Sequence, residues 1–141
     1  MKDKKRKVLI LCTGNSCRSQ MGEVLVNERL GEKWQAYSAG TDPAGYVHSR
    51  AIQVLEEIGI QHQGRSKRID ELPEKDFDLV ITVCDDAAEN CPLWLGQGKR
   101  THIGFPDPAK TEGSEEEVLA VFRQVRDDIE EQIIAFIKAQ D

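Results

Sequence analysis

Short apolar segments alternate along this 141-residue chain with longer segments whose apolar residues recur every three or four positions. Strands that alternate with helices are joined by crossovers, and such crossovers align the strands in parallel. We therefore expect a single α/β domain over residues 8–141, a four-stranded parallel open sheet flanked by helices, after a charged tail over residues 1–7. The expected strands are 7–12, 34–39, 77–83 and 100–105, and the expected helices are 18–29, 47–58 and a last one that starts after Ser114.

The last expected helix has the clearest pattern in the chain. Ser114 can cap its first turn, and the three glutamates that follow suit the positive end of the helix dipole. This pattern predicts a long amphipathic helix that packs against the sheet. Its apolar residues recur at steps of three or four: Val118, Phe122, Val125, Ile129, Ile133 and Phe136.

Composition and charge exclude several classes of protein. With 39% hydrophobic and 31% charged residues, the chain is typical of a soluble globular domain. The apolar stretch after the charged start, residues 8–11, is too short for a signal peptide, and no run approaches the roughly 18 residues of a membrane span. A net charge of -6 argues against general nucleic-acid binding. We expect a cytoplasmic monomer that binds neither nucleic acid nor membrane.

The four cysteines are Cys12, Cys17, Cys84 and Cys91. In a reducing cytosol, cysteines serve catalysis, redox chemistry or metal binding more often than structural disulfides. Cys12 and Cys84 each end an expected strand, and Asp107 follows the last one. Ligands of open α/β sheets bind beyond the carboxyl ends of the strands, so we expect these three residues to share one site.

The junction between the first strand and the first helix predicts an oxyanion-binding loop. A short loop there can turn its backbone N–H groups inward, and the helix N-terminus adds its positive dipole end. Arg18 can add a bidentate contact to the anion, while Ser19 and the same donors can stabilise a thiolate on Cys12. The alternative, a buried strand cysteine beside a surface arginine, fits the intervening small polar residues less well. The junction reads Cys12-Thr13-Gly14-Asn15-Ser16-Cys17-Arg18-Ser19.

Asp107 lies between Pro106 and Pro108, which restrict the loop and hold its carboxyl group in place. A carboxylic acid near a thiolate can protonate a leaving oxygen, so we interpret Asp107 as a general acid. The alternative is a simple turn, because Asp and Pro are common turn residues.

Cys84 and Cys91 are separated by six residues that can form one or two helical turns. Such turns can bring the two thiols together or near Cys12, which favours a relay in which disulfides are passed along. Inert buried thiols are one alternative. A zinc site is another, but paired zinc ligands are usually about two to four residues apart, and we expect no metal. Cys17 is interpreted as a small residue packed inside the loop.

Taken together, these residues resemble the arsenate reductases built on the low-molecular-weight tyrosine-phosphatase fold, over nearly the whole chain. The Cys-x5-Arg-Ser loop and the Asp107-Pro108 pair are shared by the phosphatases and the reductases. The segment Val83-Cys84-Asp85 with Cys91 is similar to the resolving cysteines of the reductases. Ala109 and Lys110 stand where the phosphatases usually carry aromatic residues.

The resemblance implies a mechanism for these residues. Arsenate binds in the loop, the Cys12 thiolate attacks arsenic, and Asp107 protonates the oxygen that leaves as water. Cys84 then attacks the Cys12 sulfur, arsenite departs, and Cys91 attacks Cys84 to leave a redox-active Cys84–Cys91 disulfide. The resemblance implies thioredoxin as the electron donor, with glutaredoxin and glutathione still open, and no tightly bound cofactor.

Some relatives bind potassium beside the anion loop, and Asn15, Glu23 and Ser38 look like part of that set. The later segment that would complete it, residues 64–68, is basic rather than acidic. A lysine or arginine there can supply the positive charge, so we predict no potassium requirement.

Two other functions remain open. In a low-molecular-weight protein-tyrosine phosphatase, Cys12, Arg18 and Asp107 would transfer a phosphoryl group, and the other cysteines would only guard against oxidation. In a non-catalytic redox module, the disulfide state would control a partner.

Overall fold

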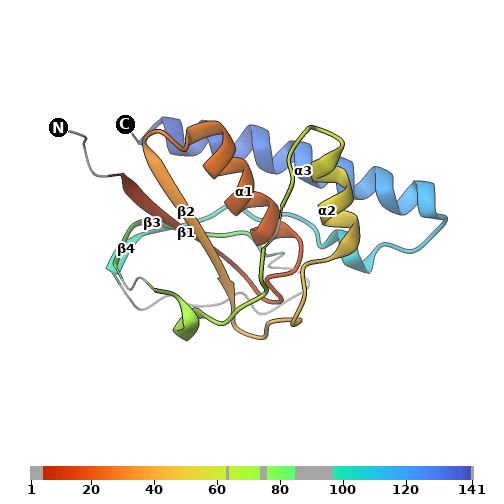
Figure 1. The fold of residues 1–141 in the computed structure, drawn as a ribbon, viewed down its shortest axis with the longest axis horizontal. Helices are drawn as coiled ribbons and strands as arrows, with labels where there is room; N and C mark the ends of the chain where they lie inside the picture. Colours follow the sequence, from red (N-terminus) through yellow and green to blue (C-terminus); the bar gives the residue numbers. More distant parts are fainter. Residues whose placement is uncertain (1–4, 63, 74–75, 85–96, 141) are drawn as a thin grey trace.

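The computed structural model describes residues 5–62, 64–73, 76–84 and 97–140. Four parallel strands form one sheet in the order β2-β1-β3-β4, so the expected α/β architecture is confirmed (Figure 1). The strands are β1 Arg6–Cys12, β2 Trp34–Gly40, β3 Asp76–Thr82 and β4 Gln97–His102. The helices are α1 Arg18–Leu30, α2 Ser49–Glu56 and α3 Glu115–Lys138, and the short 3-10 turns are η1 Ile69–Glu71 and η2 Pro108–Lys110.

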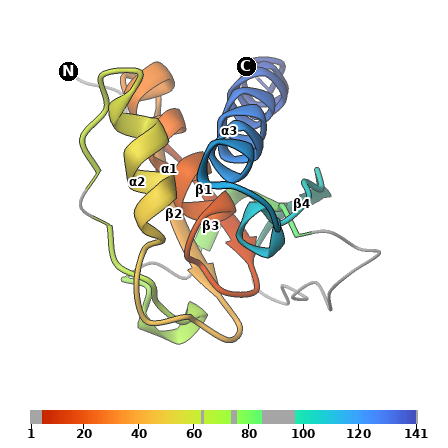
Figure 2. The same cartoon turned by 90° about the vertical axis from the view of Figure 1, so that its right-hand side faces the viewer.

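Strand β1 is the centre of the fold because both of its faces are buried. Val8, Ile10 and Cys12 belong to one cluster of buried side chains, and Leu9 and Leu11 belong to another. The first cluster lies beneath α1, α2 and α3, which cover one face of the sheet (Figures 1 and 2). The second is closed by the segment around η1 on the opposite face. A strand buried on both faces needs apolar residues at consecutive positions, which explains the uninterrupted apolar run.

The long helix α3 has the cap and the stripe that the sequence predicts. The Ser114 hydroxyl accepts a hydrogen bond from the backbone N–H of Glu117 at 3.1 Å, and the Glu117 side chain accepts one from the backbone N–H of Ser114. Phe136 is partly buried against the first cluster. The other stripe residues are all buried: Val118, Phe122, Val125, Ile129 and Ile133.

The last strand lies earlier in the chain than expected. β4 spans Gln97–His102 rather than residues 100–105. It forms an edge of the sheet, and its Lys99 and Arg100 side chains are exposed. Because an edge strand tolerates polar side chains, the low apolar content of this segment does not prevent pairing, and apolarity alone misplaced the strand.

The first strand also takes in part of the expected tail. Arg6 and Lys7 pair with Trp34 and Gln35 of β2. The Arg6 guanidinium lies over the Trp34 ring, 4.4 Å from its centroid. Its charge therefore does not keep Arg6 out of the sheet, because the flat group stacks on the aromatic face.

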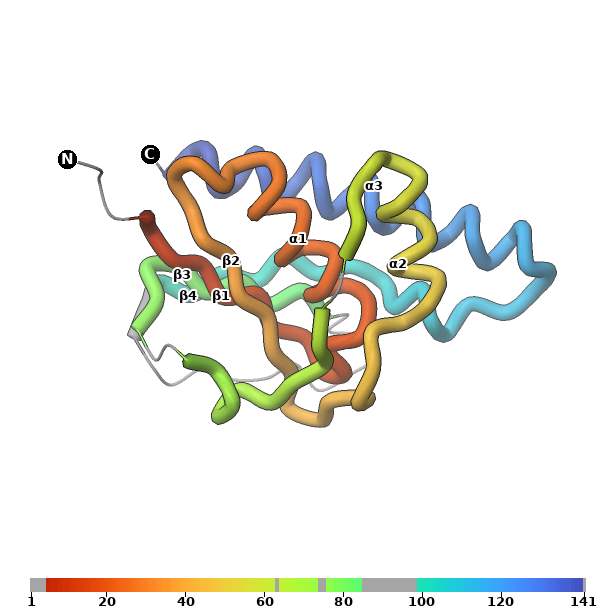
Figure 3. The backbone as a smooth tube through the Cα atoms, viewed as in Figure 1, coloured from red at the N-terminus to blue at the C-terminus, as the bar shows by residue number. Residues whose placement is uncertain are grey.

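The two ends of the sheet have different roles. β1 begins and α3 ends at the same end of the molecule, where the Arg6 guanidinium donates to the backbone oxygen of Gln140 at 2.9 Å (Figure 3). The carboxyl ends of the strands lie at the other end, where the loop after β1 meets the segment after β2. Within the described ranges, no helix is both long and apolar enough to cross a membrane.

The cap of α2 generates a prediction about pH. This helix, Ser49–Glu56, is shorter than the expected 47–58. The Nδ1 atom of His48, the residue before it, accepts a hydrogen bond from the backbone N–H of Arg50 at 3.1 Å. Burial, together with the charge of Arg50, lowers the pKa of His48 in the folded protein. The unfolded chain therefore takes up the proton first, so stability is full above the unfolded histidine pKa of about 6.5 and is lost as pH falls below it.

The variant His48→Asn keeps a capping oxygen but does not titrate. We expect urea unfolding to show that the wild type loses more stability than this variant between about pH 7.5 and pH 5.5. Equal losses in the two proteins would contradict the assignment.

Candidate active site

A cavity of about 230 Å³ lies at the carboxyl end of the sheet. The loop after β1 forms one side of it, and the segment that leads into η2 forms the other. The structure thus brings Asp107 next to Cys12 and Arg18, although about 90 positions separate it from them in the sequence. The full lining is Cys12, Thr13, Gly14, Ser16, Cys17, Arg18, Asp107 and Lys110.

A larger cavity, of about 700 Å³, lies at the other end of the molecule between the last turns of α1 and α3. Its lining residues include Glu28, Glu32, Lys33 and Lys138. No cysteine is among the described residues that line it, so the smaller cavity is the candidate active site on chemical grounds.

Two hydrogen-bond donors converge on the sulfur of Cys12. The backbone N–H of Asn15 donates to it at 3.3 Å, and the Ser19 hydroxyl lies 2.9 Å from it. The Asn15 side-chain amide donates to the Ser19 oxygen at 2.7 Å, which leaves the serine's own proton for the sulfur. Because Cys12 is only 2% exposed, these donors take the place of water around its sulfur.

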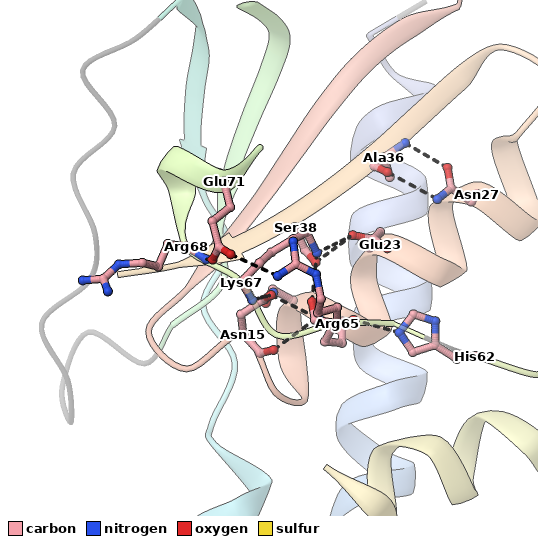
Figure 4. A network of polar contacts seen from close by, with 12 residues as sticks. Asn15, Glu23, Asn27, Ala36, Ser38, His62, Arg65, Lys67, Arg68 and Glu71 are labelled. Atoms are coloured by element: carbon pink, nitrogen blue, oxygen red, sulfur yellow. Dashed lines mark hydrogen bonds and ion pairs between the residues drawn. The ribbon is translucent and has the colours of Figure 1, made fainter. Parts of the chain in front are cut away.

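Asn15 is held by groups from beyond the loop, among them the backbone of Lys67 (Figure 4). Its backbone has a left-handed φ of 48°. Gln20 Nε2 and the backbone N–H of Lys67 each donate to Asn15 Oδ1 at 3.0 Å, so the side-chain amide has one orientation. His62 Nε2 lies 2.8 Å from Gln20 Oε1, and burial lowers the pKa of His62. Sequence reasoning missed Gln20 and His62, because no local motif marks them. Lys67 belongs to the basic segment 64–68, from which a lysine or arginine was expected to supply positive charge.

Lys67 also brings a positive charge close to the loop. Its ammonium nitrogen lies 3.7 Å from Glu23 Oε1, and the Ser38 hydroxyl donates to the same oxygen at 2.7 Å. Asn15, Glu23 and Ser38, the residues expected beside a potassium ion, therefore lie around a lysine (Figure 4). In this arrangement the Lys67 ammonium group can take the place of a bound potassium ion. Independence from potassium remains a prediction.

Arg18 and Asp107 face each other across the cavity. The guanidinium donates to the backbone oxygen of Phe105 at 3.2 Å and lies 3.6 Å from Asp107 Oδ2. Its Nε is buried and has no hydrogen-bond partner among the described residues. A buried donor of this kind suits an anionic ligand, because leaving it unpaired is unfavourable.

The carboxylate of Asp107 is anchored by its second oxygen. Asp107 Oδ1 accepts hydrogen bonds from the backbone N–H of Ala109 at 3.0 Å and from the Cys17 thiol at 3.6 Å. Burial, then the negative charges of Asp107 and Cys12, raise the pKa of Cys17 to about 12. Cys17 is thus packed in the loop as expected and is also a protonated donor to Asp107.

Cys84 lies just past β3 and is fully buried, in the same cluster of side chains as Cys12 and Cys17. Cys84 is disulfide-bonded, whereas Cys12 and Cys17 are free thiols. Cys91 lies outside the described residues, and so do the six residues before it. Within the described residues, no group of three or more His, Cys, Asp or Glu side chains is arranged to hold a metal ion.

Known proteins resemble this chain over nearly its whole length. The sequence pattern of the family described as low molecular weight phosphotyrosine protein phosphatase matches residues 7–141. A Bacillus licheniformis relative named arsenate reductase is 47% identical over 133 residues, covering 94% of this chain and 95% of its own. Another of that name, from Bacillus subtilis, is 45% identical over 123 residues, covering 86% and 88%. A solved structure described as an arsenate reductase in oxidized state is 30% identical, with a TM-score of 0.77 over 96% of this chain and 99% of that one.

The contrast between the two loop cysteines can be measured by alkylation. In a Cys84→Ser, Cys91→Ser variant, we expect iodoacetamide to modify Cys12 rapidly at neutral pH and to leave Cys17 intact until the protein is unfolded. The reason is that two close donors surround the Cys12 sulfur, whereas burial and the negative charge of Asp107 keep Cys17 protonated despite a long hydrogen bond from Ser16. Peptide mass spectrometry would locate the modification. Equal rates at both cysteines in the folded protein would refute this assignment.

Proposed function

The chain belongs to the low molecular weight phosphotyrosine protein phosphatase family, and we propose that it is a member that reduces arsenate to arsenite through a cysteine relay. The observation that carries this proposal is one cavity that holds a hydrogen-bonded Cys12 thiol, the Arg18 guanidinium and the Asp107 carboxylate. Relatives at 41–47% identity are named arsenate reductase.

Arsenate binding follows from the charges and donors of the loop. The tetrahedral oxyanion fits between the backbone of the loop and Arg18, whose buried Nε still needs an acceptor. Loop N–H groups and the first turn of α1 add positive partial charge at the same place. These contacts hold arsenic next to the Cys12 sulfur.

The first step forms a sulfur–arsenic bond. The Cys12 thiolate attacks arsenic, and one arsenate oxygen leaves as water after Asp107 donates a proton to it. Arsenic remains pentavalent in the product. Arg18 and the loop donors stabilise the negative charge that builds up on the other oxygens.

The second step carries out the reduction. The Cys84 thiolate attacks the Cys12 sulfur, the sulfur–arsenic bond breaks, and its electron pair stays on arsenic, which leaves as trivalent arsenite. The product on the protein is a Cys12–Cys84 disulfide. Cys91 then attacks Cys84, which releases the Cys12 thiolate and leaves a Cys84–Cys91 disulfide. A free Cys12 together with a disulfide-bonded Cys84 fits this last state.

The electron donor that we propose is thioredoxin, whose two thiols reduce an intramolecular disulfide and become a disulfide themselves. Glutaredoxin with glutathione is the alternative donor. We further propose that the protein works as a monomer in the cytoplasm, where the reducing environment keeps its thiols available.

A protein-tyrosine phosphatase is the second candidate, because the matching family takes its description from that activity. Cys12, Arg18 and Asp107 can equally transfer a phosphoryl group, with a cysteine–phosphate intermediate that water hydrolyses. In that case Cys84 and Cys91 have no step to perform.

The variant Cys84→Ser separates the two candidates. We expect arsenate-dependent NADPH oxidation, measured with thioredoxin and thioredoxin reductase, to fall by about 10³-fold or more, because the sulfur–arsenic bond then has no attacking thiol. Hydrolysis of an aryl phosphate by the same variant reports whether Cys12 is still correctly placed. Undiminished arsenate turnover in this variant would refute the relay.

The variant Asp107→Asn tests the proton donor. An asparagine oxygen can still accept the hydrogen bonds from Ala109 and Cys17, but its amide cannot protonate a leaving oxygen. We expect kcat for arsenate to fall about 10²-fold while KM changes little. A change confined to KM would show that Asp107 only helps to bind the anion.

A further inference from the structure

We propose that Lys110 is a specificity-determining residue of this site, whose ammonium group binds the outward oxygen of a free tetrahedral oxyanion and so selects it over an aryl ester. The proposal rests on the proposed reduction of arsenate in this cavity. It concerns a residue that neither the loop motif nor the Asp-Pro pair includes.

The turn that anchors the general acid also places Lys110. Asp107 caps the short turn η2, with its carboxylate accepting from the backbone N–H of Ala109 at 3.0 Å. The backbone N–H of Lys110 donates to the backbone oxygen of Asp107 at 3.2 Å. One turn therefore brings both the carboxyl group and the lysine to the cavity, and Lys110 is among the residues that line it.

The lining has a buried floor and an exposed rim. Cys12 and Arg18 are 2% and 3% exposed, whereas Lys110 is an exposed residue. The nucleophile thus attacks from the floor. In an in-line displacement the leaving oxygen lies opposite the attacking atom, so this oxygen points toward the rim where Asp107 and Lys110 lie.

Lys110 has no competing partner among the described residues around the cavity. Within the part of the chain that the structure describes, Lys110 forms no ion pair and no side-chain hydrogen bond. Other cations around the site are already paired: Arg50 with Glu115, Lys67 with Glu23, and Arg18 with Asp107. An unpaired ammonium group on the rim is available to an incoming anion.

The charge balance of the cavity explains why a second cation matters. Before substrate binds, an ionised Asp107 offsets the charge of Arg18, and the proposed Cys12 thiolate adds a further negative charge. Arsenate at neutral pH is itself an anion, and the whole chain carries a net charge of -6. Without Lys110, the substrate approaches a site with excess negative charge, so the lysine both attracts the anion and holds it.

The same placement disfavours an aryl ester. In such a substrate the outward oxygen carries a ring, so it is uncharged and larger. A lysine offers this ring no aromatic surface and gains no ionic contact with it. Free oxyanions therefore benefit from Lys110, and aryl esters do not.

The test measures anion binding without any redox turnover. Inorganic phosphate, a tetrahedral analogue of arsenate, is titrated against iodoacetamide modification of Cys12 in the full-length protein, with mass spectrometry of the Cys12 peptide as the readout. We expect Lys110→Met to weaken phosphate protection about tenfold, and Lys110→Arg to stay within about threefold of the wild type. Lys138→Met, at the C-terminal end of α3 and outside the lining of this cavity, is the matched control and should leave protection unchanged.

A second ligand tests selectivity. Phenylphosphonate, an aryl analogue that cannot be hydrolysed, should protect Cys12 in Lys110→Met to within about threefold of the wild type. Phosphate protection that stays within about twofold in this variant would overturn the proposal, and so would an equal loss for both ligands. If phosphate protection changes as expected but the protein does not reduce arsenate, the result would count against the reductase function and not against the role of Lys110.

Discussion

The hydrogen bonds around Asn15 are the interaction on which the rest of the site depends. A left-handed backbone costs an L-residue roughly 1–2 kcal/mol, and asparagine is among the few residues that tolerate it. This conformation directs the Asn15 N–H at the Cys12 sulfur, while the side-chain amide holds Ser19. Gln20 and the Lys67 backbone fix the opposite end of the amide. The Cys12 sulfur is thus surrounded by donors that cannot easily turn away from it.

The sheet supplies the rigid frame for this loop. β1 is buried on both faces, and at its end the loop runs close against β2. A Cβ atom at Gly40 would clash with the backbone oxygen of Thr13, so only glycine allows this approach. The loop is therefore confined between a buried strand and a neighbouring backbone, which limits the motion of the Cys12 sulfur and of Arg18.

The two loop cysteines, Cys12 and Cys17, lie in different surroundings. Cys12 receives two hydrogen bonds at its sulfur, whereas Cys17 is buried beside Asp107, which raises its pKa to about 12. The protonated Cys17 in turn donates to Asp107 and helps to orient the carboxyl group. One loop thus holds the proposed nucleophile and a support for the proposed general acid.

The sequence by itself determined the parallel α/β fold and the oxyanion loop, because both depend on local patterns. The apolar run before Cys12 is visible in the sequence alone, and the Cys12 sulfur contacts Asn15 and Ser19, which lie within seven positions of it. Even there, the edge strand β4 was misplaced, since an edge needs little apolar character. Only the tertiary structure decided which distant residues support the loop: Gln20 contacts His62, 42 positions away, and Lys67 reaches Asn15 across 52. Such contacts arise from how strands and helices pack, and no local spacing encodes that packing.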